Sequence, residues 1–326
     1  MPISVSVAAA ARLHLGFLDM NGALGRKFGG LGLSIDAPAT HLTLRPAETT
    51  EASGPDAERA YALLEKAVAA LAPGKRYRLT IERAIPPHSG LGSGTQLALA
   101  IAAALRRIED LPQDAAADAA LLQRGARSGL GAGLFTRGGL VVDGGRGADT
   151  TTPPVVSRLA FPEAWRILLV SDPAAIGLHG AEERKAFAEL PPFSEEDAGK
   201  LCRLVLMQAL PAAAEADFAA FGAAVTAIQA IVGDYFAPAQ GGRRFTSAAV
   251  ESLLARLAEA GATGVGQTSW GPTGFAFAPN DAEARRLESL ARGAAEASGL
   301  SLAVVAGSDR GARIDAVYAN IAEGRA

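Results

Sequence analysis

The chain has 326 residues, with 31 Lys and Arg against 34 Asp and Glu, and its formal charge of −3 excludes the strongly basic surface typical of nucleic-acid and anionic-membrane binders. A hydrophobic share of 49% and a charged share of 20% exclude a disordered chain. The single cysteine, Cys202, excludes an intrachain disulfide, and we expect a buried thiol in an apolar helix.

Neither a leader nor a membrane anchor is expected. The N-terminus lacks the basic segment of a secretory leader. The longest charge-free helical run, Phe218–Gly233, is shorter than the roughly 20 residues that span a membrane. We therefore expect a cytoplasmic protein with small-molecule substrates and with no nucleic acid and no membrane partner.

The first half of the chain begins with a predicted strand. Residues Ile3–Phe17 open with alternation and are rich in Val, Ile and Ala, and a glycine-dense stretch follows from Gly16 to Gly32. The helix predicted over Leu97–Ile108 is apolar on nearly every face, so we expect it to be buried. The other predicted elements of this half are strands at 40–45, 77–85 and 140–142 and helices at 56–71 and 115–125.

A segment rich in Gly, Thr and Pro, Gly144–Ser157, marks the expected domain boundary, which gives domains 1–155 and 156–326. The second half is predicted to contain a strand at Trp165–Ser171, a glycine-rich turn feeding a strand within Gly264–Phe277, and a closing strand at Leu302–Val305. Its predicted helices cover 182–190, 195–210, 214–232, 247–260 and 281–298. Strands and helices are segregated rather than strictly alternating, which favours an α+β fold over a doubly wound parallel sheet.

The most informative motif, Gly90-Leu91-Gly92-Ser93-Gly94-Thr95-Gln96, joins the strand at 77–85 to the buried helix. Glycines let a ligand approach the backbone closely, and the start of a helix adds N–H donors and a positive dipole end. The spacing matches neither the Walker A motif nor the dinucleotide-binding fingerprint. The motif predicts a cradle for a diphosphate or triphosphate, and the alternative is a glycine-rich turn that only packs the helix against the sheet.

Three segments in the same order, Ala11–Phe17 with Asp19, Pro87–Ser93 and Gly266–Phe275, resemble the signature regions of the GHMP kinase superfamily. The resemblance implies an α+β, two-domain GHMP-kinase-like fold. The N-terminal domain would resemble ribosomal protein S5 domain 2, and the C-terminal domain would be a ferredoxin-like α/β sandwich. The chain departs from the kinase pattern, because Gly94-Thr95 stands where these kinases typically have a second serine and an alanine, and Leu134–Thr136 supplies no acidic residue. We therefore expect no use of ATP.

Within the superfamily the chain looks like the beta-ribofuranosylaminobenzene 5'-phosphate synthase family. The segments that carry this likeness are Arg12–Asp19, Phe28–Gly32, Arg137–Gly145 and Gly177–Glu183. The resemblance implies an enzyme of tetrahydromethanopterin biosynthesis that condenses 5-phosphoribosyl diphosphate with 4-aminobenzoate or 4-hydroxybenzoate. The products would be a C-riboside 5'-phosphate, CO2 and diphosphate. The resemblance also implies Mg2+ as cofactor, and we expect a homodimer.

Four polar residues near the first strand are candidates for chemistry. Arg12 and His14 are two residues apart on that strand, so their side chains point to the same side. The planar fork of Arg12 suits a carboxylate or phosphate, and His14 with Asp19 would orient substrate or move a proton. Lys27, beside Arg26, would clamp the 5-phosphate. A surface arginine and a merely structural His–Asp pair are the alternatives.

Later segments add further candidates. Asp143 ends a short strand and is a weak candidate for Mg2+, with a turn-capping role as the alternative. His179 precedes Glu182 and Glu183 at a helix start, where the resemblance suggests an anionic ligand or a metal. The second glycine turn offers side chains that could hydrogen-bond substrate: Gln267, Thr268 and Ser269.

Trp270 follows directly, and it would either stack on the benzoate ring or fill the core of a tight turn. Two rival functions stay open. One is an ATP-dependent small-molecule kinase of the same superfamily, and the other is a non-catalytic module that binds a phosphorylated ligand.

Overall fold

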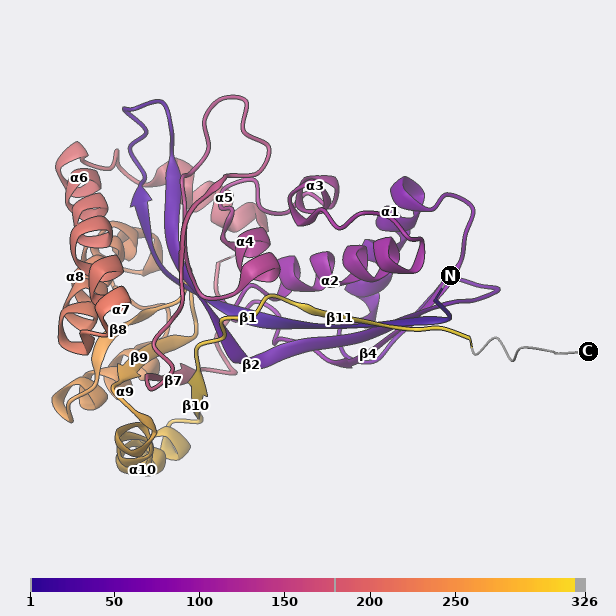
Figure 1. The fold of residues 1–326 in the computed structure, drawn as a ribbon. Coiled ribbons are helices and arrows are strands. Elements are labelled where there is room, and N and C mark those ends of the chain that lie inside the picture. The colour runs from indigo at the N-terminus through magenta and orange to yellow at the C-terminus, as the bar shows by residue number, and fades with distance from the viewer. Residues whose placement is uncertain (1, 179, 320–326) are drawn as a thin grey trace, which may run out of the picture.

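Two β-sheets, each covered by helices, form the protein in a computed structural model that describes residues 2–178 and 180–319 (Figure 1). The first sheet has seven strands and the second has four. Helices and strands occur in separate layers rather than in strict alternation, so the expected α+β class is confirmed.

The first sheet is built on two long antiparallel strands, β1 (Ser4–Asp19) and β2 (Phe28–Pro46). The central strand order is β11-β1-β2-β4-β3, while β5 pairs with the Phe28 end of β2 and then with β6. The bounds of the other strands are Glu51–Ser53 for β3, Tyr77–Arg83 for β4, Leu140–Asp143 for β5, Val155–Leu159 for β6 and Arg313–Val317 for β11.

Four helices accompany this sheet, and the central one, α2, is buried as its apolar sequence predicts. Every residue from Gln96 to Leu105 is buried. The helix begins at Ser93, earlier than predicted, because Gly92 in a left-handed conformation ends the glycine loop there. The four bounds are Ala57–Leu71 for α1, Ser93–Ile108 for α2, Ala115–Leu121 for α3 and Leu130–Arg137 for α4.

The second sheet, of order β10-β7-β9-β8, has helices on both faces. Alternate residues of its strands face opposite sides: Ile167 and Phe277 contact the layer that contains α8, whereas Leu168 and Ala276 contact α9 and α10. The strands are β7 (Arg166–Ser171), β8 (Thr263–Gln267), β9 (Gly274–Ala278) and β10 (Ser301–Ala306). The helices are α5 (Gly180–Glu189), α6 (Glu195–Leu204), η1 (Val205–Ala209), α7 (Leu210–Glu215), α8 (Phe218–Phe236), η2 (Ala237–Gln240), α9 (Ala248–Glu259) and α10 (Asp281–Ala297).

Strand β1 belongs to two hydrophobic cores. Its first half packs with α1 and α2, through Val5 and Val7, whereas its second half packs with α6 and α8, through Leu13 and Leu15. Arg12 therefore lies close to the point where β1 passes from one core to the other. This placement brings the glycine loop of the first core close to residues of the second.

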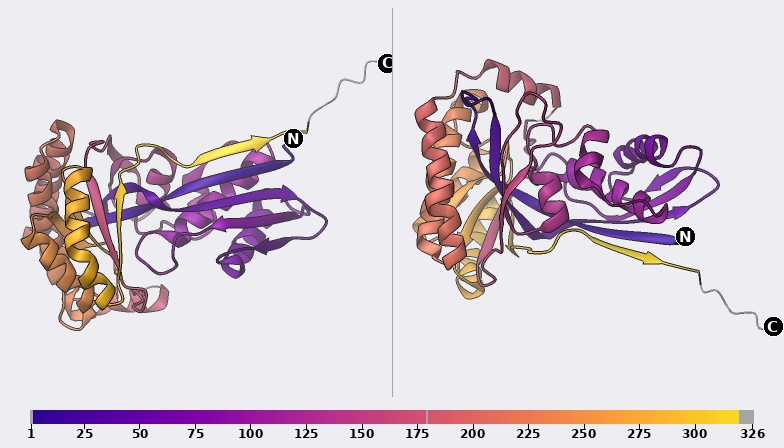
Figure 2. Two further views of the ribbon diagram at one scale, coloured as in Figure 1. Left: turned by 90° about the horizontal axis from the view of Figure 1, so that it is seen from below. Right: turned by 45° about the horizontal axis from the view of Figure 1, so that its top comes forward.

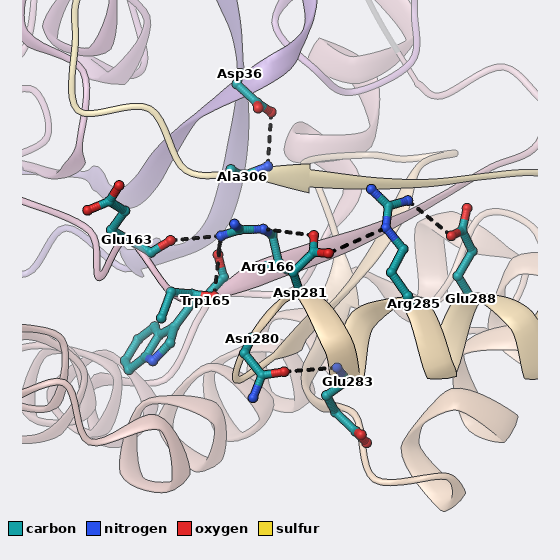
Figure 3. Close-up of polar contacts among 11 residues, drawn as sticks. Asp36, Glu163, Trp165, Arg166, Asn280, Asp281, Glu283, Arg285, Glu288 and Ala306 are labelled. Atoms are coloured by element: carbon teal, nitrogen blue, oxygen red, sulfur yellow. Dashed lines mark hydrogen bonds and ion pairs between the residues drawn. The ribbon is translucent and has the colours of Figure 1, made fainter.

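The two sheets are also joined near β10 (Figure 3). The carboxylate of Asp36 in β2 accepts a hydrogen bond of 2.9 Å from the backbone N–H of Ala306 in β10. Within the second sheet and its helices, the side chain of Arg166 in β7 donates to Asp281 at the start of α10. After β10 the chain returns to the first sheet, where β11 pairs with β1 (Figure 2).

The structure corrects several expectations. Leu302–Val305 is not the closing strand, because β11 follows it, and Gly264–Gln267 lies in strand β8 rather than in a turn. Cys202 is exposed, not buried. Helix α6 buries Leu201, and the next residue lies about 100° further around the helix, on its outer side. The predicted boundary at residue 155 falls at the first residue of β6 and stays a prediction.

Helix α8 begins and ends four residues later than the helix predicted over 214–232. By length and composition alone, Phe218–Gln240 could cross a membrane, with 39% of its most apolar window buried. Phe221, Val225 and Ile228 are fully buried in the core that includes the second sheet. This is the placement of a core helix, and core helices of soluble proteins pass the same test of length and apolarity.

Candidate functional site

The glycine loop requires glycine at two positions. Gly90 and Gly92 have φ of 79° and 80°, a left-handed conformation that side chains disfavour. A Cβ atom at Gly90 would lie 2.5 Å from the carbonyl oxygen of Thr268, and one at Gly92 would lie 2.9 Å from Cγ of Arg12. Both contacts are too short for real atoms, so the loop approaches its neighbours as closely as a backbone can.

The second half of the predicted cradle, from Ser93 onward, forms the first turn of α2. The backbone N–H groups of Thr95 and Gln96 donate to the carbonyl of Gly92, at 3.1 and 3.0 Å. At any helix start the first N–H groups have no partner within the helix, which leaves those of Ser93 and Gly94 directed outward. The side chain of Gln96 is buried and donates to the carbonyl of Gly131 in α4. This turn therefore offers backbone donors to an anion, while Gln96 fixes α4 beside it.

Thr268 links the three segments on which the family resemblance is based. Its fully buried hydroxyl accepts a hydrogen bond of 2.9 Å from the N–H of His14 and donates one of 3.0 Å to the carbonyl of Gly90. Arg12 adds two contacts to the same loop, from Nη1 to the carbonyl of Gly90 and from its N–H to that of Leu91. The structure thus brings β1, the glycine loop and the second glycine turn together, which the sequence alone did not predict, and Thr268 serves to position the loop.

Arg12 and His14 lie in an interior electrostatic setting. Burial lowers the pKa of Arg12 to about 10, against the opposing effect of the negative charges of Glu183 and Asp143. Burial, and then the charge of Arg12, lower the pKa of His14 to about 3, so its imidazole is neutral at pH 7. His14 Nε2 is buried and has no hydrogen-bond partner among the described residues, and it lies beside Gly30. A neutral imidazole with a free nitrogen is therefore held next to a buried cation.

Helix α5 brings an acidic residue to this region. Glu183 forms an ion pair of 2.8 Å with Arg127, whose guanidinium carbon lies 5.0 Å from the ring centre of Phe187. The charge of Glu183 also acts on Arg12. Glu183 was predicted to act with His179, but His179 lies outside the described residues. Arg127, the ion-pair partner of Glu183, was missed, although the sequence Arg124-Gly125-Ala126-Arg127 places two cations shortly before α4.

Asp143 is fully buried, and both of its carboxylate oxygens are used inside the protein. Oδ2 accepts from the hydroxyl of Ser128 and the N–H of Gly129, and Oδ1 accepts from the N–H of Gly145. Burial raises its pKa, and these hydrogen bonds oppose that effect. Asp143 thereby holds the start of α4 and its own turn, which supports the turn-capping alternative, and its role as a magnesium ligand stays a prediction.

Asp19 and Lys27 lie at the far end of the β1–β2 hairpin. Asp19 Oδ1 accepts from the N–H groups of Asn21 and Gly22, and no hydrogen bond joins it to His14 among the residues that the structure describes. Lys27 is exposed, with its ammonium nitrogen 5.8 Å from the ring centre of Phe28. The structure therefore places Arg12 and His14 together at the loop, whereas the contacts of Asp19 and Lys27 among the described residues are with other residues of the hairpin.

The second glycine turn directs fewer side chains to the candidate site than its polar residues suggested. The side chain of Gln267 bonds to Gln240 and to the N–H of Thr246, inside the second domain. Trp270 is buried, and its ring centre lies 4.1 Å from that of Phe236. Trp270 therefore packs in the core, which was the alternative to stacking on the benzoate ring. Substrate contacts by Gln267 and Ser269 stay predictions.

Comparison with known proteins agrees with this arrangement. The family model described as GHMP kinases N terminal domain matches residues 57–139, and the one described as GHMP kinases C terminal matches residues 209–295. Homoserine kinase from Cytophaga hutchinsonii has a similar fold, with a TM-score of 0.65 at 15% identity over 97% of this chain and 98% of that one. The expected GHMP-type fold is confirmed.

Two relatives identify the family of this chain within the GHMP superfamily. The beta-ribofuranosylphenol 5'-phosphate synthase of Methanothermobacter thermautotrophicus is 30% identical over 83% of this chain and 88% of its own length. The protein of the same name from Archaeoglobus fulgidus is 34% identical over 67% of this chain and 73% of its own length. These relatives, together with the two family models, show that the chain belongs to the beta-ribofuranosylphenol 5'-phosphate synthase family of the GHMP superfamily.

Proposed function

We propose that this enzyme condenses 5-phosphoribosyl diphosphate with a para-substituted benzoate, either 4-hydroxybenzoate or 4-aminobenzoate, in tetrahydromethanopterin biosynthesis. The bond between ribose C1 and the diphosphate oxygen breaks, and the ring carbon that bears the carboxylate bonds to C1. The bond from that carbon to the carboxylate then breaks, and its electron pair returns to the ring as CO2 leaves. The products are diphosphate, CO2 and a C-riboside 5'-phosphate.

The glycine loop, fixed between Arg12 and Thr268, carries this proposal. Negative charge grows on the departing diphosphate, and backbone N–H groups at the start of α2 are oriented to stabilise it. The loop is held on its inner side by residues of β1 and of the second domain, so its donors stay in place during the reaction. The work of these residues is positioning and electrostatic stabilisation, for which no strong base is needed.

Magnesium is part of the proposal. The described residues contain no group of three or more His, Cys, Asp or Glu placed to hold a metal. Asp143 uses both oxygens in hydrogen bonds, and Glu183 is paired with Arg127. Mg2+ is commonly bound through substrate phosphates and few protein ligands. We therefore propose that the ion accompanies the diphosphate of the substrate, and we assign it no protein ligand.

The name of the two relatives specifies a phenol, which favours 4-hydroxybenzoate as the acceptor of this enzyme. A site that hydrogen-bonds one para group discriminates strongly against an analogue that lacks it. A comparison of kcat/KM for the two benzoates decides the preference. The cytoplasmic location and the homodimer stay predictions, and light scattering of the purified protein measures the latter.

The decisive experiment supplies Mg2+, 5-phosphoribosyl diphosphate and a carboxyl-labelled benzoate to the purified protein, without ATP. We expect equal amounts of labelled CO2 and diphosphate, released only when both substrates are present. Unsubstituted benzoate is the control, because it lacks the para donor and should release neither product. ATP-dependent phosphorylation of a metabolite, without release of CO2, would instead identify a kinase. Binding of 5-phosphoribosyl diphosphate without turnover of any benzoate would identify a binding module.

A further inference from the structure

Two arginines from separate segments meet at the first turn of α2, beside Gly94, whereas Arg12 lies beside Gly92; we call the Gly94 side the outer side of the loop. Arg59 comes from α1, and Arg124 comes from the connection between α3 and α4. A Cβ atom built on Gly94 would lie 3.5 Å from Nη1 of Arg59 and 3.4 Å from Nη1 of Arg124. Both guanidinium groups therefore lie beside the same point of the helix start, and the missing side chain of Gly94 keeps that point open.

The charges of this arginine pair are poorly compensated. Arg59 forms an ion pair with Asp56, whereas Arg124 has no ion pair among the described residues. Burial, and then the charge of Arg59, lower the pKa of Arg124. The Nε atoms of both residues are buried and lack a hydrogen-bond partner in the described part of the chain. Two like charges held together with unused donors are unfavourable alone, and an anion between them would relieve the repulsion.

We propose that Arg59 and Arg124 bind a phosphate group of the ribosyl substrate at the outer side of the glycine loop, an inference that rests on the proposed function. The planar guanidinium fork binds phosphate oxygens in pairs, which a lysine cannot do. The N–H groups of Ser93 and Gly94 at the helix start supply further donors to the same anion.

A neighbouring groove gives room for the rest of such a ligand. It has a volume of about 500 Å³ and is lined by the start of α1, with Asp56, Glu58 and Arg59, and by Pro87 and His88, which precede the glycine loop. Arg59 thus lies both on the groove and beside Gly94. A phosphate held by the pair would place the remainder of the molecule along the loop rather than in bulk solvent.

Titration calorimetry with two probes, inorganic diphosphate and ribose 5-phosphate, tests this site without any turnover. The variants are Arg59→Gln and Arg124→Gln, and Arg292→Gln on the exposed side of α10 is the matched control. We expect each single substitution to raise the Kd of one probe at least tenfold, because a charge-assisted hydrogen bond is lost. Arg292→Gln should leave the Kd of both probes unchanged. The probe that weakens identifies which phosphate group the pair holds.

Arg124→Lys keeps the positive charge but loses the planar guanidinium group. We expect its Kd for the affected probe to lie between those of the wild type and Arg124→Gln. Unchanged melting temperatures of the variants in the absence of ligand show that the fold is intact. Wild-type Kd values for both probes in Arg59→Gln and Arg124→Gln would overturn the inference, as would a wild-type protein that binds neither probe.

The two proposals fail in different ways. Wild-type protein that releases CO2 and diphosphate, with variants that bind both probes normally, would leave the function standing and remove the arginine site. Wild-type protein that lacks turnover, but loses probe binding in the variants, would keep the anion site and remove the synthase function.

Discussion

The two sides of the glycine loop hold arginines in opposite electrostatic settings. On the inner side, Arg12 donates to the carbonyl of Gly90 and lies in the field of Asp143 and Glu183. On the outer side, Arg59 and Arg124 lie beside one another with Asp56 as the acid paired with Arg59. The inner charge is balanced within the protein and holds the loop, whereas the outer charges are available to an external anion.

This contrast separates two roles of the basic residues near the glycine loop, which the sequence alone does not distinguish. A buried cation with acidic neighbours contributes to the stability of the fold, because its removal leaves buried carboxylates unbalanced. A pair of cations that repel one another stabilises the folded protein little or destabilises it, and its favourable interactions form only when an anionic ligand binds. Stability and ligand binding should therefore respond differently to substitutions on the two sides.

The largest effect is expected from Gly90→Ala, which adds a methyl group where the loop contacts Thr268. The added Cβ would lie 2.5 Å from the backbone oxygen of Thr268 in a left-handed conformation, so the loop must move. We expect turnover to fall at least about a hundredfold and the free energy of unfolding to fall by about 1–3 kcal/mol.

Gly74→Ala is the matched control for that substitution. Gly74 has a similar φ of 82°, and nothing lies within 4 Å of its added Cβ. It should show a backbone cost of about 1–2 kcal/mol and normal turnover. Equal turnover in the two variants would show that the shape of the loop does not matter to the reaction.

The second prediction compares Arg12→Gln with Arg124→Gln in urea unfolding. Arg12→Gln removes a positive charge that lies in the field of Asp143 and Glu183, together with a hydrogen bond to the carbonyl of Gly90, and we expect the free energy of unfolding to fall by about 2–4 kcal/mol. Arg124→Gln removes a repulsion with Arg59, and we expect no loss of stability. Similar losses in both variants would contradict the difference between the two sides.

The smallest effect concerns His14 and the dependence of stability on pH. Its pKa falls from 6.5 in the unfolded chain to about 3 in the folded protein, so the unfolded state binds more protons between these values. Stability should therefore rise with pH across this window, and it should fall by about 2–3 kcal/mol as the pH drops from 6.5 to about 4.5. His14→Phe removes this contribution, and a pH dependence as steep as that of the wild type would argue against a buried neutral imidazole.

Local patterns in the chain predicted much of the fold. Alternation gave the position of β1, and an all-round apolar helix correctly predicted the burial of α2. Strands β3, β6 and β11 were missed, because they are short, lie at the edges of the sheet and bury little. Cys202 was misplaced for a similar reason, since the outward face of α6 depends on what that helix packs against.

The sequence by itself determined the glycine loop, its helix and the family, because these depend on backbone freedom and side-chain types within one short segment. Only the tertiary structure decided which polar residues meet that loop. It brought Thr268 to Gly90 and Arg124 to Arg59, and it left Asp19 and Lys27 at the end of a hairpin. Such meetings depend on how distant elements pack around shared cores, and spacing along the chain does not record that packing.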